Sequence, residues 1–196
     1  MGAKVLVIDN VDSFVYNLVQ LVREAEESCH FDLVLSSEIK LSRLKRYDGL
    51  IISPGPGLPS DQPLMMQALQ HFANEGKPIL GICLGCQAIA EYFGYQLRQL
   101  PRPLHGHTSY LEHNEKGLLS GLSPRVAIAR YHSWVVDLQS NLAGELKELG
   151  YSLDADGKQT MVIAHKSLPI YGLQFHPESM ISSEGHIYIK NWLRRL

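Results

Sequence analysis

The sequence predicts an α/β fold with an open, mostly parallel central sheet, helices on both faces and antiparallel strands added in the C-terminal half. Two observations predict it. In the first half of the chain, short apolar runs typical of buried parallel strands alternate with segments whose apolar residues recur at helical spacing. After Pro101 the pattern changes to a series of shorter strands, which antiparallel additions to the sheet would explain. The length suits one compact domain, and we expect residues 1–196 to form it.

Each element is predicted from a local pattern. Asp12 or Ser13 is suited to cap the first helix, whose apolar residues recur at helical spacing from Phe14 to Val22. The strand-helix-strand-helix-strand order at the start of the chain implies parallel pairing with right-handed crossovers. The expected strands are residues 4–8, 31–35, 49–52, 78–82, 108–112, 126–131, 145–153, 160–165 and 170–174. The other expected helices are residues 41–46, 64–73, 83–93 and 183–195.

The composition excludes several classes of protein. A formal net charge of −2 gives no general electrostatic reason to bind nucleic acid or an anionic membrane surface. The longest apolar runs are the length of a strand, and the N-terminus leads directly into one, so neither a membrane span nor a signal peptide is expected. Three cysteines do not suit a secreted disulfide framework. We therefore expect a cytoplasmic protein with reduced thiols.

A candidate nucleophile lies in the segment Gly-Ile-Cys-Leu-Gly at residues 81–85. A sharp turn from strand to helix would expose Cys83, and the glycines on both sides allow neighbouring backbone to come close. Helix N-terminal amides favour negative charge, which suits a thiolate. The amide of Leu84 would face an oxyanion formed beside the sulfur. Alone, the segment fits a buried, inert cysteine equally well.

The candidate base is His176, in the sequence His-Pro-Glu. Pro177 forces His176 into extended geometry, in which residues i and i+2 project to the same side. Glu178 can then bind one imidazole nitrogen and leave the other free to face Cys83.

A third segment, Ser-Pro-Gly-Pro-Gly at residues 53–57, predicts a rigid turn whose glycine amides can approach a ligand. The amide of Gly57 would be the second oxyanion donor, opposite Leu84. These three segments follow predicted strands, as residues 9–14 also do. All four should meet at the carboxyl edge of the sheet, where α/β proteins bind ligands.

These segments resemble the class I (triad-type) glutamine amidotransferases, over essentially the whole chain. Within that family the sequence is similar to anthranilate synthase component II and to the glutaminase subunit of aminodeoxychorismate synthase. The segments that carry this closer resemblance are residues 9–14, 105–106, 108–109, 121–122, 130–133 and 174–179.

The resemblance implies Cys83 as nucleophile, His176 as acid and base, and Glu178 as the residue that orients it. It implies hydrolysis of L-glutamine through a thioester, without metal or organic cofactor. The ammonia would go to a chorismate-binding synthase subunit in a hetero-oligomer, for the tryptophan or the folate pathway. The implied glutamine-contacting residues are Gly55, Pro56, Gly57, Gln87, Ser133 and Trp134.

Three positions depart from the family's pattern: Cys86 replaces His, His107 replaces Lys and Trp134 replaces Leu. Cys86 completes a Cys-x-x-Cys, so a redox protein is one alternative interpretation. In a glutaminase, Cys86 would either pack beneath Cys83 or form a disulfide with it on oxidation. His107 lies in a segment that resembles the partner-facing region. Two further alternatives are a non-catalytic binding module and a glutaminase for a GMP, CTP or carbamoyl phosphate synthase.

Overall fold

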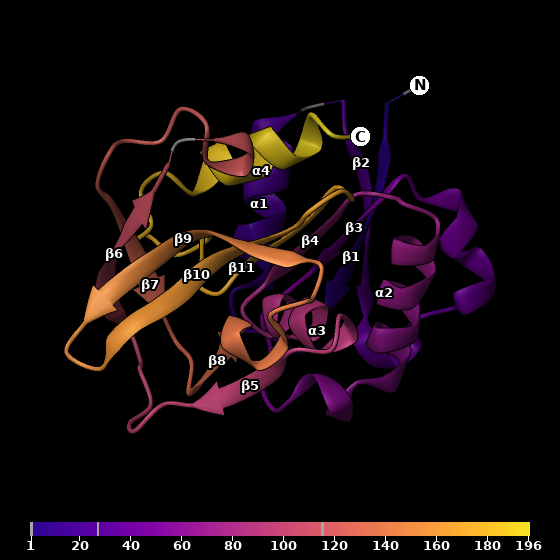
Figure 1. Ribbon diagram of the computed structural model, residues 1–196. Helices are drawn as coiled ribbons and strands as arrows, with labels where there is room; N and C mark the ends of the chain where they lie inside the picture. Colours follow the sequence, from indigo (N-terminus) through magenta and orange to yellow (C-terminus); the bar gives the residue numbers. More distant parts are fainter. Residues whose placement is uncertain (1, 27, 115) are drawn as a thin grey trace.

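The computed structural model describes residues 2–26, 28–114 and 116–196. In that part of the chain, one sheet contains nine strands in the order β2-β1-β3-β4-β11-β10-β9-β6-β7 (Figure 1). The first five of these are parallel, and β10, β9, β6 and β7 continue the sheet with antiparallel pairing. Their bounds are β1 (Lys4–Asp9), β2 (His30–Leu35), β3 (Gly49–Ile52), β4 (Ile79–Ile82), β6 (His107–His113), β7 (Val126–Arg130), β9 (Leu146–Asp154), β10 (Gly157–His165) and β11 (Ile170–Leu173). The predicted fold class is confirmed.

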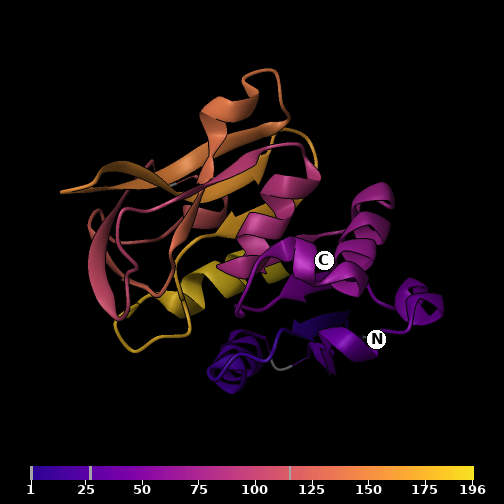
Figure 2. The ribbon, with the colours of Figure 1, turned by 90° about the horizontal axis from the view of Figure 1, so that it is seen from below.

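Helices cover both faces of the sheet (Figures 1 and 2). Alternate residues of each strand point to opposite faces, so Val5 and Val7 belong to one core and Leu6 and Ile8 to the other. The first core contains α1 (Val15–Ala25) and α4 (Gly185–Leu193), which contact each other, and the second contains α2 (Pro63–Asn74) and α3 (Leu84–Tyr92). No helix among the described residues is both long enough and apolar enough to cross a membrane.

The first helix begins later than predicted. Its N-cap is Phe14, without a side-chain cap, so the prediction of Asp12 or Ser13 as the cap was wrong. The Asp12 carboxylate instead accepts a hydrogen bond from the Phe14 amide at 2.9 Å, within a turn where Val11 has a φ of 61°. Phe14, the first residue of the predicted apolar spacing, lies before the helix and is 45% exposed.

Two strands were missed. β5 (Gln96–Gln99) and β8 (Trp134–Asp137) form a separate antiparallel ribbon. β5 is polar and mostly exposed, so it carries little of the apolar signal that identifies a buried strand. The segment predicted as a helix at residues 41–46 is a 3-10 helix, η2 (Leu41–Arg46). The other 3-10 turns are η1 (Ser36–Glu38), η3 (Pro59–Asp61), η4 (Gly117–Leu119) and η5 (Leu138–Asn141).

Candidate active site

The carboxyl ends of four neighbouring parallel strands, β1, β3, β4 and β11, bring the predicted segments together. Asn10, just after β1, is fully buried and binds Ser53, just after β3, through two hydrogen bonds of 3.0 Å. Cys83 follows β4, and its amide donates to the Leu173 carbonyl at the end of β11, at 2.7 Å. His176 lies three residues beyond. The sheet topology therefore gathers these segments at one edge, as expected.

Cys83 occupies a strained turn between β4 and α3. Its φ of 49° is rare for a residue with a side chain, and such strain persists only where the surroundings enforce it. The flanking glycines explain how the turn closes. A Cβ on Gly81 would overlap the backbone of Gly85, and one on Gly85 would lie 2.6 Å from the Ile52 carbonyl oxygen. Both glycines are thus required by close backbone contact, and Leu84 begins α3 directly after Cys83.

His176 and Glu178 form a buried pair, with 2.6 Å between Nδ1 and Oε1. The backbone of His176 is anchored on both sides, because its amide donates to Ala129 at 2.9 Å and its carbonyl accepts from the Ser182 hydroxyl at 2.7 Å. Burial alone would lower the pKa of His176. The hydrogen bonds and negative charges of Cys83 and Glu178 outweigh it and raise that pKa well above its usual value. Glu178 holds Nδ1 of the ring, and Nε2 is buried without a hydrogen-bond partner at normal distance in the described part of the chain.

Cys83 lines a cavity of about 380 Å³, which we term the Cys83 cavity. Every residue predicted to contact glutamine lines it: Gly55, Pro56, Gly57, Gln87, Ser133 and Trp134. Gly57 has a φ of 80°, and a Cβ on Gly55 would lie 2.7 Å from the Asn10 carbonyl oxygen, so the turn needs both glycines. Gln87, one turn into α3, donates to the Trp134 carbonyl at 2.9 Å and so joins two walls of the cavity.

Other residues of the site were not predicted individually. Pro103, Leu104, His105, Tyr131 and His132 also line the Cys83 cavity. The Tyr131 ring contacts the His176 ring edge-to-face, with centroids 5.1 Å apart. Gln174 approaches the Cys83 sulfur with its side-chain nitrogen, at 3.8 Å. The signal was present for His105, Tyr131, His132 and Gln174, because the resemblance had already singled out residues 105–106, 130–133 and 174–179; Pro103 and Leu104 lie outside these segments.

Cys86 points away from the cavity. It is buried in the core on the α2–α3 side, and its sulfur would lie 2.7 Å from a Cβ on Gly172. Burial raises the pKa of the Cys86 thiol well above its usual value, and the nearby Cys83 adds to the effect. The two cysteines are not bridged. Among the described residues, no cluster of His, Cys, Asp or Glu side chains is arranged to hold a metal ion.

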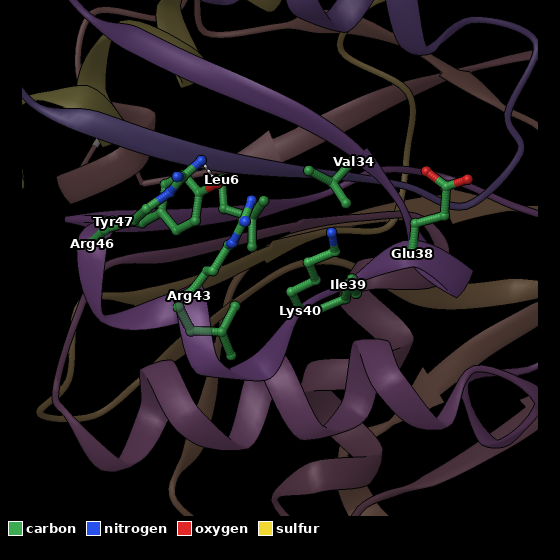
Figure 3. A pocket seen from close by; sticks show the side chains of 9 residues that line it. Leu6, Val34, Glu38, Ile39, Lys40, Arg43, Arg46 and Tyr47 are labelled. Atoms are coloured by element: carbon green, nitrogen blue, oxygen red, sulfur yellow. Dashed lines mark hydrogen bonds between the residues drawn. The ribbon is translucent and has the colours of Figure 1, made fainter.

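A second cavity, of about 200 Å³, lies between the edge strand β2, its neighbour β1 and the 3-10 turns that follow β2 (Figure 3). Leu6 and Val34 contribute apolar side chains, and Lys40, Arg43 and Arg46 contribute positive charge. None of the predicted site residues lines this cavity. The nucleophile and the glycine turn both line the Cys83 cavity, and the ring of Tyr131, another lining residue, contacts the His176 ring.

The comparisons with known proteins agree with this geometry. The chain is 41% identical over 192 residues to "Bifunctional protein TrpGD" of Thermotoga maritima, covering 97% of this chain but 32% of that one. It is 39% identical to anthranilate synthase component 2 of Leptospira biflexa and 37% identical to aminodeoxychorismate synthase component 2 of Serratia marcescens. Each match covers 97% of this chain, and 98% and 99% of the relatives.

The fold is shared with a solved structure, that of a putative GMP synthase component from Thermoplasma acidophilum. That structure superposes with a TM-score of 0.83 at 24% identity, covering 99% of this chain and 94% of the other. The family model described as "Glutamine amidotransferase class-I" matches residues 6–196. The chain belongs to the class-I glutamine amidotransferase family.

Proposed function

We propose that this chain is the glutaminase subunit of a chorismate-using synthase, acting in the cytoplasm as one catalytic domain. It hydrolyses L-glutamine to glutamate and ammonia, and the ammonia passes to the synthase subunit in a hetero-oligomer. The observation that carries the proposal is a cysteine on a strained turn that lines the Cys83 cavity and interacts with a buried His–Glu pair. The names of the relatives support the chorismate partner.

The arrangement suits acyl transfer through a thioester. The Cys83 thiolate attacks the side-chain amide carbon of glutamine, and the amides of Gly57 and Leu84 stabilise the oxyanion. As the intermediate collapses, His176 Nε2 donates its proton to the leaving nitrogen, and ammonia departs. The neutral His176 then takes a proton from water as the water oxygen attacks the thioester. Glutamate leaves, and the thiolate and protonated imidazole are restored. Glu178 holds the ring and stabilises its charged form.

Replacement of the nucleophile tests the chemistry. We expect Cys83→Ala to lower glutamine-dependent ammonia release by about a thousandfold or more, as nucleophile removal does in other enzymes. Ammonia-dependent synthesis by the partner should be retained, because that reaction bypasses the glutaminase. Cys29→Ala is the matched control, since Cys29 is a partly buried cysteine outside the Cys83 cavity. Glutaminase activity that survives in Cys83→Ala would disprove the assignment.

The product of the complex is a separate question, because relatives of similar identity carry both the anthranilate and the aminodeoxychorismate names. We expect the chain to co-purify with one or both of these synthases and to support glutamine-dependent synthesis with the partner it binds. Binding to neither synthase, with binding to a GMP, CTP or carbamoyl phosphate synthase instead, would show that the glutaminase serves a different reaction.

A further inference from the structure

Arg130, the last residue of β7, is fully buried and uses all three nitrogens of its guanidinium group. Nη1 forms an ion pair with Asp154 and donates to the hydroxyls of Ser109 and Ser152, both at 3.2 Å. Nη2 donates to the side-chain oxygen of Gln159. The remaining nitrogen, Nε, donates to Nε2 of His132 at 3.1 Å. A buried cation is thus neutralised on one side and attached to an imidazole on the other.

This contact fixes the tautomer of His132. A guanidinium group can only donate, so Nε2 of His132 must accept, and the proton of the neutral ring must be on Nδ1. Burial, then the positive charge of Arg130, then that of His176, lower the pKa of His132 to about 3. The ring is therefore neutral at physiological pH.

Nδ1 of His132 is buried and has no hydrogen-bond partner at normal distance in the described part of the chain. The Trp134 backbone is the one neighbour that raises the pKa of the ring. That contribution opposes those of burial and of the two cations but does not outweigh them. The Trp134 carbonyl accepts the hydrogen bond from Gln87.

His132, Ser133 and Trp134 form one wall of the Cys83 cavity. All three of their carbonyls are held by groups from other segments. The hydrogen bonds run from the Leu104 amide to His132 at 3.0 Å, from the Leu100 amide to Ser133 at 2.8 Å and from the Gln87 side chain to Trp134 at 2.9 Å. The His132 side chain adds a further attachment, because it joins this wall to the buried Arg130 of β7.

We propose that His132, held by Arg130 as the neutral Nδ1–H tautomer, is a positioning residue for the glutamine-binding wall formed by Ser133 and Trp134. The same arrangement keeps a second positive imidazole away from His176, whose protonated form the reaction needs. This inference rests on the proposed glutaminase function of the cavity.

The ionisable groups around His132 come from several elements. Arg130 and, through it, Asp154 lie on the β7 and β9 side. His176 approaches from the segment after β11 and interacts electrostatically with the ring. Cys83 and His105 line the same cavity. The cations nearest to the ring, Arg130 and His176, both oppose its protonation, and Asp154 is occupied by Arg130.

Two variants separate positioning from acid–base chemistry. In His132→Gln, an amide oxygen can accept from Arg130, but the side chain does not titrate. We expect its kcat/KM to stay within about threefold of wild type. His132→Leu leaves the buried Nε of Arg130 without a partner and should raise KM for glutamine by about 10- to 100-fold, with a smaller change in kcat. His186→Gln, an exposed histidine on α4, is the matched control.

The pH profile and the tautomer supply the decisive measurements. The acid limb of kcat/KM should give the same apparent pKa in wild type and His132→Gln, because His132 does not titrate there. Nitrogen NMR of the imidazole should show the Nδ1–H tautomer from about pH 8 down to about pH 5.

A ring that carries its proton on Nε2, or becomes charged in that range, would overturn the proposal. So would a loss in His132→Gln as large as in His132→Leu, or a displaced acid limb in His132→Gln. If His132→Leu does not fold, His132→Gln and the NMR measurement decide. The NMR measurement requires no turnover, so it distinguishes an incorrect tautomer from failure of the proposed function, which Cys83→Ala tests.

Discussion

The buried His132 should make the protein less stable in mild acid, by an amount that its pKa sets. In the folded chain this pKa is about 3, against an ordinary value of 6.5. Between these two pKa values, His132 is protonated in the unfolded chain but not in the folded chain. The free energy of unfolding therefore falls as pH falls below about 6.5. Each pH unit costs about 1.4 kcal/mol, and at pH 5 the loss amounts to about 2 kcal/mol. Above about pH 6.5 the contribution is fully present.

His176 acts in the opposite direction. Its pKa is raised in the folded chain, so its stabilising contribution is complete below about pH 6.5 and is lost as pH rises through the raised value. Wild type alone therefore reports the sum of two opposing effects. A comparison of wild type with His132→Gln at each pH removes the contribution of His176, because both proteins retain that residue.

Urea denaturation at about pH 7.5 and about pH 5 measures the difference. Between these two values, wild type should lose about 2 kcal/mol more of its free energy of unfolding than His132→Gln does. Equal losses in the two proteins, within about 0.5 kcal/mol, would refute the reasoning, because they would mean that His132 is protonated in the folded state.

Three further predictions follow from the geometry around Cys83. Glu178→Gln removes a charge that helps to raise the pKa of His176, so this pKa should fall. We expect kcat to drop at least about a hundredfold, and an unchanged pH–rate profile would contradict the prediction. Gly85→Ala places a Cβ 2.6 Å from the Ile52 carbonyl oxygen and should cost about 1–3 kcal/mol of stability by thermal unfolding, whereas a neutral result would show that the turn can relax. Cys86→Ala should be inactivated by mild peroxide at the wild-type rate, because Cys86 packs in the core; a Cys83–Cys86 linked peptide found by mass spectrometry in wild type alone would show the opposite.

The sequence alone predicted the features that local physics controls. Apolar runs of strand length and segments at helical spacing predicted the sheet, and the start and end of most elements agree with the structure within one or two residues. Gly81 and Gly85 predicted a close backbone turn, and Pro177 predicted an extended His176 with Glu178 on the same side. These features depend on neighbours a few residues apart, whose preferences are visible in the sequence.

Other features depended on contacts distant in the chain. The polar ribbon formed by β5 and β8 exists because the two strands pair with each other, and neither has a strong pattern of its own. The helix after β1 begins at Val15 because the Asp12 carboxylate closes the preceding turn instead of capping the helix. The direction of the Cys86 side chain, which the motif left open, follows from its packing against Gly172 on β11.

The sequence by itself determined the fold class and the nucleophile and base candidates, because turn chemistry and periodicity are local properties, and its resemblance to the class I glutamine amidotransferases indicated the family. Only the tertiary structure determined the electrostatic state of the site. Arg130 and His132 are two residues apart in the chain. The neutrality of His132 follows from burial, then from the charge of Arg130, and then from the charge of His176, which is more than forty positions away. The pKa of a side chain is set by the charges and the solvent around it in space, and these are assembled only when the strands of the sheet come together.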